Sequence, residues 1–137
     1  MARQPFAIQG IDHIVLKVSD AARMCAFYCE VLGCAVEREQ PQLGLTQLRA
    51  GASLIDLVTR DGPLGRGGPA GGGHNLEHFC LTLTPFDEQP LIGWLADQGV
   101  AAHDPAARYG AGGEGRSFYV EDPEGNRVEL KGACPRG

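Results

Sequence analysis

A long apolar run is missing from this chain. None of its hydrophobic stretches approaches the roughly 20 residues needed to cross a bilayer, and its first residues, Met-Ala-Arg-Gln-Pro, contain no apolar core of the kind found in signal peptides. An excess of positive charge is missing too, because 12 Lys and Arg residues stand against 17 Asp and Glu residues, for a formal net charge of −5. Nucleic acids and anionic membrane surfaces attract basic faces. We therefore expect a cytoplasmic protein with no nucleic-acid or membrane partner.

Paired cysteines are also missing from the sequence. The chain has five cysteines, an odd number, and no two of them form a C-x-x-C motif. This pattern favours neither a disulfide framework nor a zinc knuckle. Cys25 and Cys29 stand four apart on a predicted helix, where we expect buried free thiols rather than a metal or redox pair. No function is assigned to any of the five, Cys25, Cys29, Cys34, Cys80 and Cys134.

A phosphate-binding loop is the third absence. Residues 61–75 are rich in glycine and proline, yet they contain neither the Lys-Ser/Thr of a P-loop nor a G-x-G-x-x-G run that leads from a strand into a helix. Glycine increases the entropy of the chain and proline interrupts regular structure. We expect a flexible linker here, with His74 as one of its solvated side chains.

The sequence does contain one pattern that occurs twice. At 137 residues, the chain 1–137 has the length of a single domain, and each half predicts the same order of elements, strand–helix–strand–strand–strand. Module 1 covers about residues 8–60 and module 2 about residues 76–131, with the linker between them. The predicted fold class is α+β, with two βαβββ modules.

Local signals define the elements of module 1. Ser19 or Asp20 caps a helix with one apolar face, and Gly33 suits the left-handed position that ends it. Three strands follow, and a tight turn at Gly51 joins the last two. Alternating apolar residues indicate that each strand buries one face.

Module 2 repeats this plan with a less regular middle. A helix is expected around Asp87–Gln98, followed by a short strand near Val100–His103. The glycine-rich stretch Asp104–Gly115 is predicted to be irregular, with Arg108 and Tyr109 in a loop. Two strands joined by a Pro-x-Gly turn complete the module, since proline fixes φ and glycine accepts positive φ.

Each module has a histidine near its start and a carboxylate near its end. In the first strand the aliphatic residues occupy one face, which leaves the histidine on the other. In the last strand the carboxylate likewise stands opposite its aliphatic neighbours. A charged group among aliphatic residues is costly unless it is paired or ligated. The residues concerned are His13 and Asp56 in module 1, and His78 and Glu129 in module 2.

These four groups predict one divalent metal site if the modules curl towards each other. Imidazole and carboxylate ligands suit Zn, Ni, Fe(II) or Mn(II), and two histidines with one carboxylate form a frequent Fe(II) site. The alternative is structural, with each histidine and carboxylate forming a buried hydrogen-bonded pair. The matching placement in two similar modules favours the metal.

Several motifs resemble those of the vicinal oxygen chelate superfamily, which groups glyoxalases, bleomycin resistance proteins and extradiol dioxygenases. They cover roughly residues 8–131, nearly the whole chain. They are Asp12-His13-Ile14-Val15-Leu16, Phe27-Tyr28 with Leu32-Gly33, Leu54-Ile55-Asp56-Leu57, Glu77-His78-Phe79, and the run from Phe118 through Asp122-Pro123-Glu124-Gly125 to Leu130.

This resemblance implies a curved, eight-stranded mixed sheet around a metal cavity, and a small substrate that chelates the metal. His13, His78 and Glu129 match the positions that ligate metal in most active members. Asp56 matches the position of a fourth ligand, usually glutamate, in glyoxalase I enzymes. Because aspartate is one methylene shorter, it either ligates directly or orients a ligand or a metal-bound water. Family members commonly form homodimers, with sites sometimes built from both chains.

The favoured function is a metal-dependent glyoxalase-like lyase or isomerase, with Glu129 or Asp56 as the base. An extradiol, ring-cleaving dioxygenase that uses Fe(II) is the first alternative. Tyr119 matches the tyrosine of that family's motif, but Gly110-Ala111-Gly112 stands where the family has a histidine.

Two further alternatives remain open. Residues 113–119 resemble the potassium-binding loop of fosfomycin-type thiol transferases, although Val15 replaces the threonine expected there. A metal-free binding protein, of the bleomycin resistance kind, would use the same groove without chemistry.

Three residues are expected to contact the substrate. Gln47 and Arg49 occupy alternate positions of an inner strand, and Tyr119 is both a binding and a catalytic candidate. Arg49 suits a substrate carboxylate, and its alternative role is a surface salt bridge.

Overall fold

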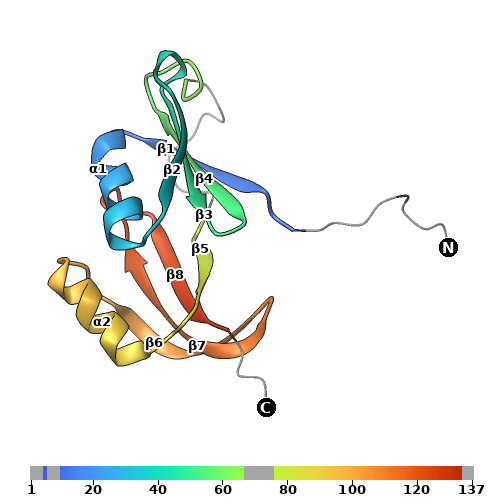
Figure 1. Ribbon diagram of the computed structural model, residues 1–137, viewed down its shortest axis with the longest axis vertical. Coiled ribbons are helices and arrows are strands. Elements are labelled where there is room, and N and C mark those ends of the chain that lie inside the picture. Colours follow the sequence, from blue (N-terminus) through green and yellow to red (C-terminus); the bar gives the residue numbers. More distant parts are fainter. Residues whose placement is uncertain (1–4, 6–9, 67–75, 134–137) are drawn as a thin grey trace. The chain divides into compact units, whose positions relative to one another are not determined.

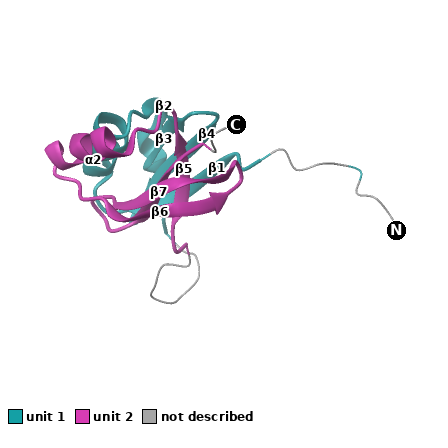
Figure 2. Cartoon of the chain, turned by 90° about the horizontal axis from the view of Figure 1, so that it is seen from below, with its two compact units in different colours: residues 1–68 teal, residues 69–137 magenta. Residues whose placement is uncertain are grey.

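The computed structural model describes residue 5, residues 10–66 and residues 76–133. The chain consists of two compact units, Met1–Gly68 and Pro69–Gly137, which are coloured separately in Figure 2. The larger part of the predicted linker, together with His74 and Cys134, lies outside the described residues.

Unit 1 is a βαβββ module whose four strands form one sheet in the order β1-β4-β3-β2 (Figure 1). Strands β1 and β4 are parallel, and the other neighbours are antiparallel. The elements are β1 (His13–Val18), α1 (Ala21–Ala26), a π-helical turn (Phe27–Val31), β2 (Ala35–Gln40), a 3₁₀ turn (Pro41–Leu43), β3 (Leu45–Ala50) and β4 (Ser53–Thr59).

The helix of unit 1 begins and ends as predicted. The side chain of Asp20 accepts a hydrogen bond from the backbone N–H of Arg23 at 3.0 Å, which satisfies one of the free amides of the first turn. Gly33 has a φ of +86°, so it can follow the helix without the strain that a side chain would bring. Helix α1 packs on β3 and β4, and Met24 is fully buried.

Unit 2 repeats the same order of elements. Its sheet has the strand order β5-β8-β7-β6, again with the first pair parallel and the others antiparallel. The elements are β5 (Phe79–Leu83), α2 (Glu88–Asp97), β6 (His103–Gly110), β7 (Gly113–Glu121) and β8 (Arg127–Gly132).

The prediction of an irregular stretch at Asp104–Gly115 is wrong, because these residues form most of the β6–β7 hairpin. One of the glycines that suggested irregularity, Gly115, is instead required by close packing between strands. A Cβ on Gly115 would lie 2.7 Å from the carbonyl oxygen of Gly132, so a larger residue would push the strands apart. Glycine content alone therefore does not distinguish a loop from a tightly packed hairpin.

Strand β6 also accommodates two residues that are unusual within a strand, Pro105 and Asp104. It is the edge of the sheet, where proline is tolerated, and Pro105 lies at the shift in register between His103 and Ala106. Asp104 has a φ of +54° where the register with β7 shifts, as in a β-bulge. Arg108 and Tyr109 consequently lie on a strand rather than in a loop, and Tyr109 is 86% exposed.

The described cysteines are unpaired, as predicted, but they are not buried. Cys80 is exposed, and Cys25, Cys29 and Cys34 are partly buried. The sulfur atoms of Cys25 and Cys29 are 3.9 Å apart. Desolvation of its thiol raises the pKa of Cys29 to about 11, with a further contribution from the hydrogen bond to Cys25. Cys29 is therefore a protonated thiol at neutral pH.

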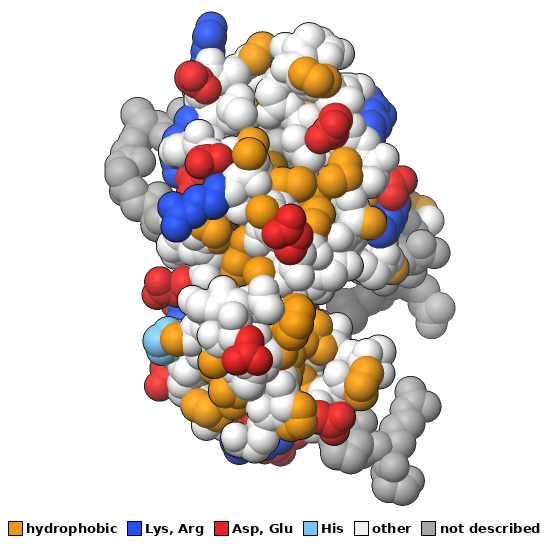
Figure 3. Space-filling model, turned by 60° about the vertical axis from the view of Figure 1, so that its left-hand side comes forward, with side chains coloured by type: hydrophobic (Ala, Val, Ile, Leu, Met, Phe, Trp, Pro, Cys, Tyr) orange, Lys and Arg blue, Asp and Glu red, His pale blue; other side chains and the backbone are white. Residues whose placement is uncertain are grey.

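The α+β class and the two βαβββ modules are confirmed, with eight strands in two four-stranded sheets among the residues that the structure describes. In the part of the chain that the structure describes, no helix has the length and apolarity needed to span a membrane. Acidic and basic side chains are both present on the face drawn in Figure 3.

Candidate metal centre and neighbouring cavity

His13 is the first residue of β1 and is held by the residue before it. Its Nδ1 lies 2.7 Å from Oδ1 of Asp12. This hydrogen bond is the main reason why the pKa of His13 is raised above 6.5, and the charge of Asp56 adds to it against the opposing effect of burial. When Nδ1–H donates to Asp12, the lone pair of Nε2 is available to a metal ion.

Asp56 is a buried carboxylate on β4, and it faces the same side of the sheet as His13. Its register partner on β1 is Val15, two positions after His13. The Nε2 of Gln47, its partner on β3, lies 3.2 Å from both carboxylate oxygens of Asp56. An ionised carboxylate can accept about four hydrogen bonds, so Asp56 retains acceptor capacity for a cation.

Arg49 is engaged by another side chain of unit 1. Its Nε donates to Oε1 of Glu37 at 3.1 Å, and both side chains are more than 40% exposed. This is the surface salt bridge that was the alternative role for Arg49. The side-chain amide of Gln47 likewise donates a hydrogen bond to Asp56. Its observed partner is therefore this carboxylate, whereas the sequence predicted a contact with the substrate.

In unit 2, His78 directly precedes β5 instead of lying within the strand. Its Nδ1 forms a hydrogen bond with Glu77, and its Nε2 lies 3.4 Å from Oε1 of Glu129. Glu77 also accepts a hydrogen bond from Arg127 at 2.8 Å. The bond to His78, followed by that to Arg127, lowers the pKa of Glu77.

Tyr119 lies on β7 beside the carboxylate of unit 2, since it is the register partner of Glu129 on β8. Its ring packs edge-on against the His78 imidazole, with 5.3 Å between ring centroids. The guanidinium carbon of Arg127 lies 3.8 Å from the ring centroid, and that of Arg108 lies 4.6 Å away. Both distances are in the range of cation–π contacts. The structure thus brings His78, Glu129 and Tyr119 together in one cluster.

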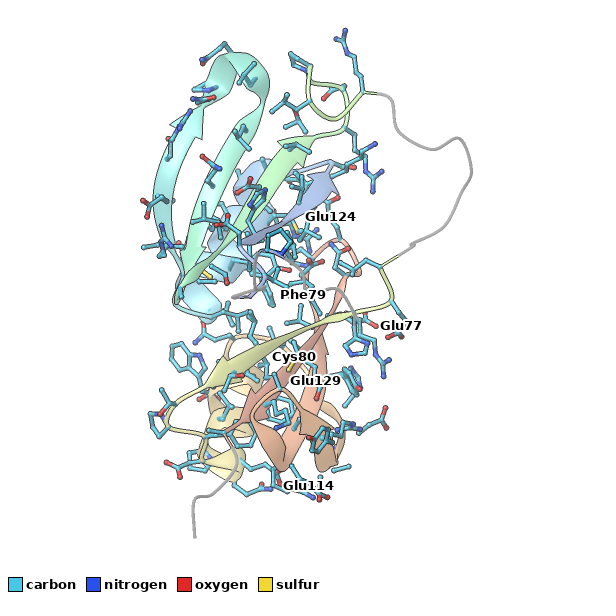
Figure 4. The ribbon with its side chains drawn as sticks, turned by 90° about the vertical axis from the view of Figure 1, so that its right-hand side faces the viewer. Glu77, Phe79, Cys80, Glu114, Glu124 and Glu129 are labelled. Carbon is cyan, nitrogen blue, oxygen red and sulfur yellow. The ribbon has the colours of Figure 1, made fainter. Side chains whose placement is uncertain are left out.

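A cavity of about 240 Å³ adjoins this cluster in unit 2. It is lined by Glu129 and Lys131 of β8, by Cys80 and Thr82 of β5, and by the tip of the β6–β7 hairpin. Figure 4 shows Glu129 close to Cys80, its register partner on β5. Desolvation and then the charge of Glu129 raise the pKa of Cys80 to about 11, so this thiol is protonated at neutral pH.

Each unit therefore has the same two-part arrangement. A carboxylate directly before the histidine binds Nδ1, and a second, buried carboxylate lies on the strand that pairs in parallel with the histidine strand. Sequence reasoning missed the first carboxylate, although Asp12 and Glu77 directly precede the two histidines. It also missed Arg127 and Lys131, which flank Glu129 at positions two residues away.

The donor set fits a divalent metal ion in its chemistry. Two imidazoles and two carboxylates are ligands that suit Zn, Ni, Fe(II) or Mn(II), and the Nε2 of His78 already lies 3.4 Å from the carboxylate of Glu129. Each unit contributes one imidazole and one buried carboxylate. Among the residues that the structure describes, no group of three or more His, Cys, Asp or Glu side chains is assembled closely enough to hold a metal ion.

Comparison with known proteins identifies the family. The model of the Glyoxalase/Bleomycin resistance protein/Dioxygenase superfamily matches residues 10–130. This chain belongs to that superfamily. The resemblance inferred from the sequence motifs is thereby confirmed.

Two proteins and their structures illustrate the similarity within the superfamily. Virulence protein STM3117 of Salmonella typhimurium is 34% identical over 127 residues, which are 90% of this chain and 83% of that protein. Its crystal structure superposes with a TM-score of 0.75, at 27% identity, over 94% of this chain and 100% of that chain. An integron cassette protein from the mobile metagenome of V. cholerae gives a TM-score of 0.73 at 28% identity, over 94% and 98% of the two chains.

A third solved structure has the same fold as this chain. TnmS3, an antibiotic binding protein from Streptomyces sp. CB03234, has a TM-score of 0.69 at 23% identity, over 94% of this chain and 99% of that chain. At this identity the likeness to TnmS3 shows the fold alone. The superfamily includes many enzymes, and its members commonly bind a divalent metal ion. The reaction of this member has to be argued from its own residues.

Proposed function

We propose that this chain is a metal-dependent, glyoxalase-like lyase or isomerase for a small substrate that chelates the metal through two vicinal oxygens. The supporting observation is the duplicated arrangement of a carboxylate-held histidine and a buried carboxylate on the neighbouring strand. His13, His78 and Glu129 are the proposed ligands. The two pairs meet either within one chain or across a homodimer.

Asp56 is proposed as a fourth ligand or as the group that orients one. It is 6% exposed, and Gln47 is its donor within hydrogen-bond distance. A buried carboxylate with spare acceptor capacity is stabilised by a nearby cation. The metal is one divalent ion, Zn, Ni, Fe(II) or Mn(II).

The proposed chemistry divides between the metal and the side chains. A bound divalent metal would supply Lewis-acid stabilisation of negative charge on the substrate oxygens. Glu129 or Asp56 accepts the proton from the carbon that carries one of the two oxygens. The same carboxyl group then returns this proton to the adjacent carbon, which carries the other oxygen. Tyr119, which packs against His78 and Arg127, presents its phenol to the substrate beside Glu129.

A ring-cleaving extradiol dioxygenase is the second candidate. The contact between Tyr119 and His78, beside Glu129, is the observation that favours it. Fe(II), a catechol and molecular oxygen would then be required together. The two candidates predict different metals and different co-substrates.

The remaining alternatives have less support. In a fosfomycin-type thiol transferase, the 113–119 loop would hold a potassium ion, but the Lys131 ammonium already contacts the carbonyl of Gly113 at 2.7 Å. A metal-free binding role would leave the two carboxylate-held imidazoles without a function.

The test is proton exchange by the metal-loaded protein. Protein loaded with Zn, Ni or Mn is incubated in D2O with 2-oxoaldehyde thiol adducts and 2-hydroxyketones, and deuterium incorporation is followed by NMR. We expect exchange that is lost in Glu129→Gln and retained in Glu114→Gln, an exposed control on β7. Exchange that is independent of the metal would refute the proposal. Oxygen uptake with catechol by the Fe(II) form, without proton exchange, would favour the dioxygenase.

A further inference from the structure

Lys131 is a buried cation on the cavity side of β8. It follows Glu129 by two positions, so both side chains face the same side of the sheet, and only 4% of the residue is exposed. Its ammonium donates to the carbonyl of Gly113 at 2.7 Å and lies 3.4 Å from that of Gly132. These acceptors are neutral, and an ammonium has three N–H donors.

No carboxylate within the described ranges forms an ion pair with Lys131. Glu129, which lines the same cavity, contacts His78 instead. A buried charge is costly unless it is paired. An ammonium that is held by carbonyls, faces a cavity and has no counter-ion is the arrangement expected of an anion-binding group.

The β6–β7 hairpin is shaped around this side chain. A Cβ on Gly110 would lie 3.3 Å from Cε of Lys131, and one on Gly115 would lie 3.4 Å from its Nζ. Side chains at either position would crowd the lysine. The glycine-rich tip thus leaves room for the ammonium while the Gly113 carbonyl fixes its position.

The cavity beside Lys131 has room for a small molecule. Its volume of about 240 Å³ lies just below the usual range of ligand pockets. Glu129, the proposed metal ligand, and Lys131 both line it. A substrate that chelates a metal at Glu129 therefore has a fixed positive charge within the same cavity.

We propose that Lys131 binds an oxyanion group, a carboxylate or a phosphate, on the substrate. The substrate class is then a small anionic molecule with vicinal oxygens. This inference rests on the proposed function only for the role of Glu129, because anion binding by Lys131 can be measured separately from metal uptake.

The presence of only two lysines, Lys17 and Lys131, makes a direct test possible. Protein labelled with ¹³C-lysine gives two Cε signals, which are followed by NMR during titration with inorganic phosphate or with glycolate. We expect the Lys131 signal to shift and saturate, while that of Lys17, exposed on β1, stays in place. The probe that saturates at the lower concentration identifies phosphate or carboxylate as the preferred group. Equal, unsaturable drift of both signals would overturn the proposal.

Variants then assign the effect to the charge of Lys131. Lys131→Met, which removes the charge and keeps an unbranched side chain one atom shorter, should weaken binding of the probe by at least about tenfold, the effect of losing a charged hydrogen bond. Arg23→Gln, which removes one positive charge from an exposed position on α1, should change it by less than about twofold. Unchanged binding by a folded Lys131→Met protein would overturn the proposal. If circular dichroism shows that this variant is unfolded, the titration of the unmodified chain decides.

Glu129→Gln separates this inference from the proposed function. The variant loses a proposed metal ligand and keeps Lys131, so we expect it to lose metal uptake and to retain the Lys131 shift. Metal uptake by the unmodified chain without a Lys131 shift contradicts the inference alone. A Lys131 shift in a chain that takes up no metal supports the inference and contradicts the proposed function.

Discussion

At the scale of single residues, the proposed metal site depends on the carboxylates that directly precede the two histidines. Asp12 holds Nδ1 of His13, and Glu77 holds Nδ1 of His78. Such a partner fixes the tautomer and the orientation of an imidazole, and it makes Nε2 a better ligand. Glu77 is itself fixed by Arg127. We therefore expect the positions before the histidines to set the affinity of the proposed site, while the histidines themselves are required for it.

Removing either partner should weaken metal binding without removing a ligand. We expect Asp12→Asn and Glu77→Gln each to reduce the affinity for Zn(II) by about 10- to 100-fold, the usual effect of losing such a partner. Competition with a fluorescent zinc chelator measures this change. Glu114→Gln is the control of equal charge, and an equal loss of affinity in that variant would refute the role assigned to Asp12 and Glu77.

The same contact predicts a pH dependence of the metal-free protein. The hydrogen bond to Asp12, together with the charge of Asp56, raises the pKa of His13 above 6.5. Because the folded-state pKa is raised, the stabilisation is complete below pH 6.5 and is lost as the pH rises through the folded value. Imidazole NMR titration should place His13 above 6.5, and Asp12→Asn should move it back towards 6.5. A wild-type value below 6.5 would contradict this account.

The sequence identified some site residues and missed others for a physical reason. Alternation along single strands places His13 and Asp56 on a face opposite the aliphatic residues, and the structure agrees. Contacts between side chains on different strands produce no such periodic pattern in the sequence. The stacking of Arg127 on Tyr119 depends on the β7–β8 pairing, and the burial of Lys131 depends on the hairpin that covers it.

At the scale of elements, the β6–β7 hairpin is the least predictable part of unit 2 and the most informative. Its glycines allow the two strands to pack closely against β8 and Lys131. Helices and turns elsewhere follow from short-range signals, such as the Asp20 cap and Gly33. The hairpin instead follows from contacts between residues that are distant in the sequence, which no local pattern contains.

Alanine substitution at two glycines tests this view. A Cβ at position 115 would lie 2.7 Å from the Gly132 carbonyl oxygen, whereas one at position 112 would meet nothing within 4 Å. We expect Gly115→Ala to lower the free energy of unfolding by about 1–3 kcal/mol, as overpacking does. Gly112→Ala should leave it within about 0.5 kcal/mol of wild type, as is usual for surface positions. Equal effects of the two substitutions on urea unfolding would show that the hairpin is not closely packed.

At the scale of the whole molecule, the two units carry equivalent pairs of ligands, which we propose bind one metal ion. The repeat was visible in the sequence because each module contains the same strand patterns, and the family assignment agrees with it. The sequence contains no comparable pattern that identifies the metal or the substrate class. Both depend on the three-dimensional arrangement of the proposed ligands, which a local sequence pattern does not contain. The proposal therefore makes its strongest prediction about the two histidines together.

If both histidines bind one ion, their contributions should not be additive. Removing the first ligand should abolish most of the affinity, so that the double variant His13→Ala with His78→Ala is little worse than either single variant. Isothermal titration with Zn(II) on the three variants measures this coupling. Additive losses would indicate two separate weak sites, one in each unit.

The most direct test of the central claim is the metal content of the untagged protein, purified anaerobically without chelators and measured by plasma mass spectrometry. We expect about one equivalent of divalent metal per chain, as for a single site of this donor type. It should be lost in His13→Ala and in His78→Ala and retained in His103→Ala, a control on β6. A wild-type chain that contains no metal and takes up none on titration, or a His78→Ala chain that keeps its full content, would contradict the account.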